Sequence, residues 1–200
     1  MNLPLKNELL RKTIHLSFIW IPIIYSYLDK KLMIIIMFII TSLAIILEIL
    51  KRYNPILKSL YNKFFKNILR EEEKTRIISD GSYLLLACFM TILFFSKFNA
   101  ILAISVLIVS DPIAALFGKK FGKIIISDNK TLEGFLAFIC SGLLVLFTIG
   151  FYSSKGIKYY IITFFIILIS AIVELFSKKI GINDNFLIPF LIALTLTIFL

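Results

Sequence analysis

A single stretch of this chain, residues 110–134, carries most of the residue types that could act on a phosphate. It contains the carboxylate Asp111 within an apolar run and two glycines four positions apart, Gly118 and Gly122. Its lysines are Lys119, Lys120, Lys123 and Lys130. A carboxylate can hold a divalent cation, lysines supply positive charge to phosphates, and glycines let an anion approach the backbone. The stretch predicts a metal–phosphate site, although a basic loop between membrane helices would also explain the lysines.

The composition excludes an ordinary soluble domain. Hydrophobic residues make up 60% of the 200 positions, and the mean hydropathy is +0.96. Apolar runs long enough to cross a bilayer occur at 13–28, 32–50, 79–96, 98–117, 132–152, 158–176 and 185–200. The sequence therefore predicts an all-α, polytopic integral membrane bundle of about seven transmembrane helices, with residues 1–200 forming a single domain.

The net charge of +10 would suggest a nucleic-acid partner in a soluble protein, but here its distribution predicts orientation instead. With seven spans, the amino-terminal segment shares one side with the loops 51–78, 118–131 and 177–184. That side carries 17 basic residues and the other side five. By the positive-inside rule, the amino terminus is cytoplasmic. We expect a protein of the cell (inner) membrane whose active site faces the cytoplasm and which binds no nucleic acid.

Residues 51–78 form the only long connection between predicted spans. Apolar residues recur there at spacings of three and four between basic residues, which predicts an amphipathic helix along the cytoplasmic interface. This connector either anchors the bundle to the headgroups or controls access of a substrate.

Ionisable residues are costly inside a bilayer, so each one is a functional candidate. Five acidic residues lie at the predicted cytoplasmic ends of spans: Glu48, Asp111, Glu133, Glu174 and Asp184. The first span adds Arg11, Lys12 and His15, the only histidine, which is either a base or an interfacial hydrogen-bonding residue. Thr131 and Glu133 begin the fifth span, where a helix amino terminus favours anions. Together these residues suggest a metal–triphosphate site, because Mg²⁺ commonly uses one or two protein carboxylates plus substrate phosphates.

Four motifs in this chain resemble the membrane polyprenol kinase family, which contains dolichol kinase, phytol kinase and the CTP-dependent diacylglycerol kinase. The motifs are Glu8-x-x-Arg11-Lys12-x-x-His15, Ser110-Asp111-Pro112-x-Ala114-Ala115-x-x-Gly118-x-x-x-Gly122-Lys123, Lys130-Thr131-Leu132-Glu133-Gly134 and Asp184-Asn185-x-x-Ile188-Pro189. The resemblance covers nearly the whole chain. It implies a phosphotransferase that moves the terminal phosphoryl group of CTP, or another nucleoside triphosphate, to a membrane isoprenoid alcohol or diacylglycerol.

The resemblance also suggests a role for each candidate residue, with Mg²⁺ or another divalent cation as cofactor. The expected metal ligands are Asp111 and Asp184. The base for the lipid hydroxyl is Asp111, Glu133 or His15. The expected nucleotide-binding residues are Gly118, Lys119, Lys120, Gly122, Lys123, Lys130 and Thr131. The expected supporting residues are Arg11, Lys12, Glu48, Glu174, Lys178 and Asn185, among which Glu48 and Glu174 either pair with Arg11 or lysines or form purely structural ion pairs.

Two other functions are weighed against the kinase. Phosphatidate cytidylyltransferases are similar in the central motifs, but they transfer a cytidylyl group to a lipid phosphate. Their carboxyl-terminal Gly-His-Gly-Gly…Asp-Arg run is absent here, since residues 188–191 lead straight into an apolar span. A small transporter would distribute polar residues through the depth of the membrane, whereas the charges here gather at one end. Both comparisons favour the kinase.

Overall fold

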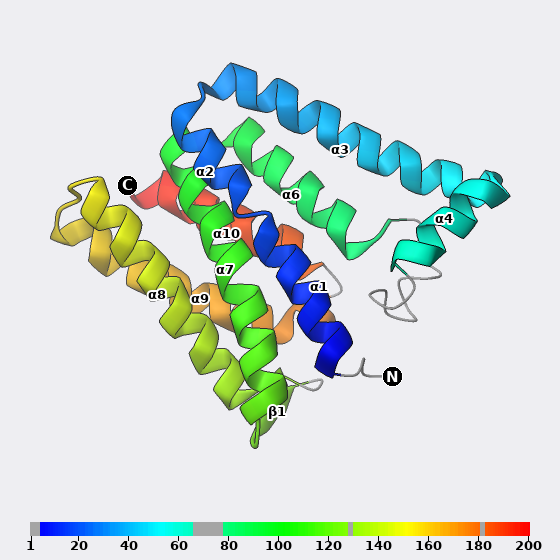
Figure 1. Ribbon diagram of the computed structural model, residues 1–200. Helices are drawn as coiled ribbons and strands as arrows, with labels where there is room; N and C mark the ends of the chain where they lie inside the picture. The colour runs from blue at the N-terminus through cyan, green and yellow to red at the C-terminus, as the bar shows by residue number, and fades with distance from the viewer. Residues whose placement is uncertain (1–4, 66–77, 128–129, 181–182) are drawn as a thin grey trace.

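The computed structural model describes residues 5–65, 78–127, 130–180 and 183–200, which form a helical bundle with one short β-hairpin (Figure 1). The amino-terminal helices are α1 (Leu5–Ser17), α2 (Trp20–Tyr27), α3 (Lys30–Tyr53) and α4 (Pro55–Phe65). The later helices are α6 (Asp80–Phe94), α7 (Lys97–Phe121), α8 (Leu132–Tyr152), α9 (Ile157–Ile180) and α10 (Asp184–Phe199). The predicted helical architecture is confirmed. The antiparallel pair β1 (Ile125–Ser127) and β2 (Lys130–Thr131) is a small addition to it.

Polar residues begin the helices where the chain turns back toward the bundle. Asp29 accepts the backbone N–H of Leu32 at the start of α3, and Thr131 accepts that of Gly134 at the start of α8, at 3.0 and 3.2 Å. Asn183 caps α10 in the same way. Such side-chain caps satisfy backbone donors that have no partner within the helix.

Four of the described helices are long and apolar enough to cross a membrane. They are α3, α7, α8 and the Ile157–Ser177 part of α9. The apolar helices α6 and α10 are shorter, with 15 and 16 residues. The protein is therefore an integral membrane protein, whereas the predicted number of about seven spans is not confirmed.

The first predicted span, 13–28, is wrong as a continuous helix, because α1 ends at Ser17 and α2 begins at Trp20. Between them the N–H groups of Phe18 and Ile19 bond only three residues back, at 3.1 and 3.0 Å. Pro22 explains the interruption, since its ring would clash with the Phe18 carbonyl in a continuous helix and it has no N–H to donate. The break separates the polar helix α1 from the apolar helix α2.

The helix α7 lies at the centre of the bundle and makes its most extensive contact with α8. Glycines allow the two helices to approach closely. A methyl group on Gly134 would lie 2.9 Å from the Ala114 carbonyl oxygen, and one on Gly118 would lie 3.0 Å from Thr131 Oγ1. Small residues serve this purpose at helix interfaces in membranes. Gly118 therefore has a packing role, whether or not it also approaches an anion.

Two predicted loops differ from the structure. The helix α7 continues to Phe121 and so takes up the start of the predicted loop 118–131, ending where the N–H of Gly122 bonds to the Gly118 carbonyl oxygen at 3.0 Å. The predicted connector 51–78 is helical over α4, while residues 51–53 complete α3. Residues 66–77 of the connector lie outside the described residues.

Candidate active site

Three carboxylates from distant parts of the chain meet inside the bundle. Asp111 is on α7, Glu174 is on α9 and Asp184 is the first residue of α10. One oxygen from each lies within 4.8 Å of the other two. Asp111 and Glu174 are buried, and Asp184 is partly exposed. Like charges held this close repel strongly in a poorly polar interior, so this carboxylate cluster requires cations around it.

Two lysines supply positive charge to the carboxylate cluster. Lys12 on α1 places its Nζ 2.5 Å from Asp111 Oδ2. Lys130 on β2 places its Nζ 2.6 Å from Glu174 Oε1 and 3.7 Å from Asp184 Oδ2. Lys130 also donates to the Glu174 carbonyl oxygen. The two lysines therefore bind all three carboxylates, and they reach them from α1 and from the hairpin that leads into α8.

His15 lies against the same cluster. Its Nδ1 is 3.5 Å from Asp111 Oδ2, and its side chain is 10% exposed. Its Nε2 is buried and has no hydrogen-bond partner among the described residues. Buried polar atoms are normally paired, so an unpaired one beside the carboxylates is open to a ligand group.

The carboxylate cluster fits a divalent cation by the chemistry of its donors. All three ligand groups are carboxylates, and hard cations such as Mg²⁺ prefer oxygen ligands. The two metal ligands predicted from the sequence, Asp111 and Asp184, are brought together, and Glu174 joins them. Glu174 was expected only to support the site. Glu174 pairs with a lysine, as one of the two open alternatives had it, but this lysine, Lys130, lies on β2 and not on another helix.

Other residues predicted for nucleotide binding lie on the surface or in helix contacts. Lys119, Lys120 and Lys123 are exposed at the end of α7, where the ammonium of Lys120 lies 5.1 Å from the ring centroid of Phe121. Gly122 and Thr131 pack against each other. Among the described side chains, the lysines that contact the carboxylates are Lys12 and Lys130, and of these two only Lys130 was expected to bind nucleotide.

Two further acidic candidates make contacts elsewhere. Glu133 Oε1 accepts the backbone N–H of Lys123 at 2.9 Å, which ties the start of α8 to the segment before the hairpin. Glu48 at the end of α3 accepts the backbone N–H of Ser79 at 2.8 Å and also the Ser79 hydroxyl. Glu48 thus joins α3 to the start of α6 instead of pairing with Arg11. Lys178 belongs to α9, but its side chain lies outside the described part of the chain.

The sequence prediction missed one acidic residue of this region, Asp80. It is the first residue of α6, and its carboxylate accepts hydrogen bonds from Arg11 and Asn183, both at 3.3 Å. Arg11 also binds Glu8 at 2.7 Å. The sequence could have identified Asp80, because it is a carboxylate at the start of an apolar span. It meets the same criterion as the five acidic residues that were selected.

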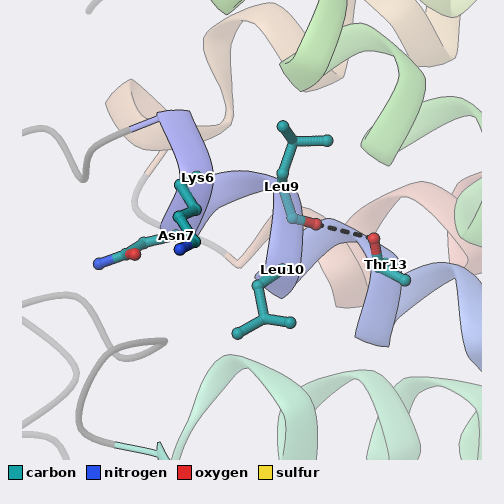
Figure 2. Close-up of a pocket in the computed structure, with 5 residues that line it drawn as sticks. All are labelled: Lys6, Asn7, Leu9, Leu10 and Thr13. Carbon is teal, nitrogen blue, oxygen red and sulfur yellow. Dashed lines mark hydrogen bonds between the residues drawn. The ribbon is translucent and has the colours of Figure 1, made fainter.

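The helix α1 has the opposite amphipathicity to that of a helix on a soluble protein. Its charged residues Glu8 and Lys12 are each 4% exposed, whereas Leu9 and Leu10 are 45% and 48% exposed. Figure 2 shows both leucines projecting from α1, with Lys6 and Asn7 toward its amino-terminal end and Thr13 one turn further on. These five residues line an open groove of about 430 Å³. The buried polar residues of α1 therefore face the carboxylate cluster, and its leucines face outward.

Comparison with known proteins places these residues in a family. Residues 4–179 match the model of the cytidylyltransferase family. The chain is 34% identical to the uncharacterised protein RP860 of Rickettsia prowazekii (strain Madrid E) over 195 residues, 94% of this chain and 93% of that protein. It is 36% identical to the uncharacterised protein MJ1137 of Methanocaldococcus jannaschii over 195 residues, 94% of this chain and 91% of that protein. No solved structure matches the chain.

A third relative connects the chain with a named activity. This relative is the dolichol kinase sec59 of Schizosaccharomyces pombe, to which the chain is 31% identical over 147 residues. The match covers 69% of this chain and 28% of that kinase. The resemblance found in the sequence, to dolichol kinases and to the related cytidylyltransferases, is thereby confirmed. Since the family match extends over most of its length, the chain belongs to the cytidylyltransferase family, a family of CTP-using, lipid-modifying enzymes.

Proposed function

We propose that this protein is a lipid-alcohol kinase that transfers the terminal phosphoryl group of CTP to a membrane isoprenoid alcohol or diacylglycerol. The observation that carries the proposal is the cluster of Asp111, Glu174 and Asp184, bound by Lys12 and Lys130. Phosphoryl transfer depends mainly on positioning and on stabilising charge, and carboxylates, lysines and a divalent cation provide both. The likeness to a dolichol kinase supports an alcohol acceptor.

The reaction forms a bond between the lipid oxygen and the γ-phosphorus and breaks the bond from that phosphorus to the bridging oxygen, so CDP leaves. When bound, a divalent cation on Asp111, Glu174 and Asp184 would neutralise charge on the triphosphate. Lys12 and Lys130 lie beside the same carboxylates and would bind phosphate oxygens of the nucleotide there. Burial of the cluster limits access of water, which would otherwise compete with the lipid hydroxyl.

His15 is the best placed of the three candidate bases. Glu133 also has a buried, unpaired Oε2, but its Oε1 is bound to the backbone of Lys123 and it is not one of the clustered carboxylates. Asp111 is paired with Lys12. In contrast, His15 presents an unpaired Nε2 within the site while its Nδ1 faces Asp111. With Nδ1 protonated and held by that carboxylate, Nε2 would orient the lipid hydroxyl toward the phosphate and take up its proton as the bond to phosphorus forms.

We place the carboxylate cluster toward the cytoplasmic side of the membrane. CTP is a cytosolic substrate, and the basic excess of the amino-terminal segment and of residues 118–131 favours the same orientation. In this arrangement α1 and α2 together form an interrupted first crossing, and the short helices α6 and α10 complete a bundle of about seven.

The lipid acceptor approaches along the outer face of α1. This face is apolar at Leu9 and Leu10, and the next turn of the same helix holds Lys12 and His15 at the carboxylates. A tail lying in the groove would therefore leave its hydroxyl within one or two helical turns of the site. Apolar side chains favour contact with a lipid tail over contact with a charged nucleotide.

Replacing Leu9 by alanine should raise the KM for the lipid alcohol about five-fold, because the tail loses roughly 1 kcal/mol of apolar contact. The KM for CTP should stay the same. Steady-state assays in mixed micelles measure both constants. The matched control is Leu144→Ala on α8, which also removes an exposed leucine. An equal effect of the two variants would show that α1 has no special part in lipid binding.

The test of the function uses CTP labelled at either the γ or the α phosphate, supplied to the purified protein with lipid alcohols and, separately, with phosphatidate. We expect lipid product labelled only from the γ position. Lipid labelled from the α position would instead assign the cytidylyl transfer that the family name denotes. Absence of lipid label from both nucleotides, in the presence of Mg²⁺, would refute the proposed function.

A further inference from the structure

Asp80 joins three elements of the active-site region through separate contacts. Its Oδ2 accepts a hydrogen bond from Arg11 Nη1 on α1 at 3.3 Å. Its Oδ1 accepts one from Asn183 Nδ2, just before α10, also at 3.3 Å. Its backbone carbonyl oxygen accepts one from Asn185 Nδ2 at 3.4 Å. The carboxylate is 19% exposed, so these bonds are only partly screened by solvent.

The contacts with Asn183 and Asn185 act on the start of α10, where Asp184 lies between the two asparagines. Asn183 caps α10, and its Oδ1 accepts the backbone N–H of Asn185 at 3.0 Å. Asp80 thus binds the residue on each side of Asp184. These contacts tie the start of α10 to the start of α6 on both sides of Asp184.

The contact with Arg11 acts on the other side of the cluster. Arg11 precedes Lys12, whose ammonium is bound to Asp111. Asp80 is in turn held in place because Ser79, the residue before it, is bound to Glu48 of α3. Asp80, held at the start of α6, therefore connects α1, which carries Lys12, with α10, which carries Asp184.

We propose that Asp80 is a positioning residue that holds Asp184 and Lys12 in the arrangement needed to bind the divalent cation. The proposal rests on the metal site of the proposed function. Residues that orient metal ligands from one contact away commonly change metal affinity by 10- to 100-fold when they are replaced. A purely structural tie at the start of α6 would weaken the fold without changing the metal affinity of the folded protein.

The experiment measures Mn²⁺ binding to the purified full chain in detergent, by loss of the electron paramagnetic resonance signal of free Mn²⁺. Asp80→Ala and Asn183→Ala should each weaken Mn²⁺ binding by about 10- to 100-fold. Because both remove the hydrogen bond between Asp80 and Asn183, their effects on Mn²⁺ affinity should be less than additive in the double variant. The matched control is Asp29→Ala, which removes an acidic residue from the start of α3 and should leave Mn²⁺ affinity unchanged.

Two results would overturn the proposal. One is wild-type affinity in folded Asp80→Ala, and the other is the absence of Mn²⁺ binding by the wild-type protein. If Asp80→Ala does not fold, the isosteric Asp80→Asn variant decides by the same criterion. Binding that follows the expected pattern, together with no label transferred from CTP, would refute the proposed function and leave the role of Asp80 at the metal site intact.

Discussion

Asp111→Asn should lower phosphoryl transfer from CTP by at least about 100-fold per folded molecule, and it should also destabilise the protein, because it leaves the buried Lys12 ammonium without its partner. Removal of one preorganised group that stabilises transition-state charge typically costs 10²–10³ in rate, and Asp111 contacts Lys12 and His15 as well as belonging to the carboxylate cluster. The measurement is γ-label incorporated into lipid, with circular dichroism and gel filtration to monitor folding.

The matched control for this prediction is Asp29→Asn. Asp29 caps α3 by accepting the N–H of Leu32, and it is not one of the clustered carboxylates. We expect near-normal turnover from this variant. If Asp111→Asn retained more than a tenth of the wild-type rate, Asp111 would have no essential part in the reaction, and the site would have to be sought elsewhere.

Lys12→Met should destabilise the protein by about 3–5 kcal/mol. The ammonium of Lys12 and the carboxylate of Asp111 are both almost fully buried, with side chains 5% and 7% exposed. Removing one partner of such a pair leaves the other charge buried without compensation, which is far more costly than replacing both. Chemical denaturation of the purified protein in detergent measures the change in the free energy of unfolding.

The double variant Lys12→Met/Asp111→Asn separates stability from activity. It should recover most of the lost free energy of unfolding, because no unpaired buried charge remains, yet it should stay inactive. Lys31→Met serves as the control, since Lys31 is exposed and its replacement should change stability by less than about 0.5 kcal/mol. A double variant as unstable as Lys12→Met would show that the ion pair is not the source of the effect.

Much of this protein could be predicted from its sequence because the bilayer restricts the possible folds. Apolar runs of the right length must be helices, since their backbone groups have no water to bond. The positions of α3, α8 and α9 accordingly agree with the predicted spans. The ionisable residues in or beside the apolar runs were identified by the same logic, including Asp111, Glu174 and Asp184.

Local chemistry also explains where this prediction failed. Pro22 interrupts the first predicted span, and the helix α7 extends past residue 117 through Gly118, which packs against α8. Each of these two differences from the predicted spans involves one residue, Pro22 or Gly118, whose effect depends on its neighbours in the fold. The exposed lysines near the end of α7 were given weight because they are close in sequence to Asp111, yet their distance along the helix leaves them at the surface.

The sequence by itself determined that this is a helical membrane protein, which family it resembles and which of its residues are costly enough at membrane depth to be functional. The tertiary structure alone decided which of those residues meet. It added Glu174 to the carboxylate cluster, revealed Asp80 and turned the leucines of α1 outward. The physical reason is that hydrophobic pattern specifies where helices form, whereas side-chain packing between helices specifies their rotation and register.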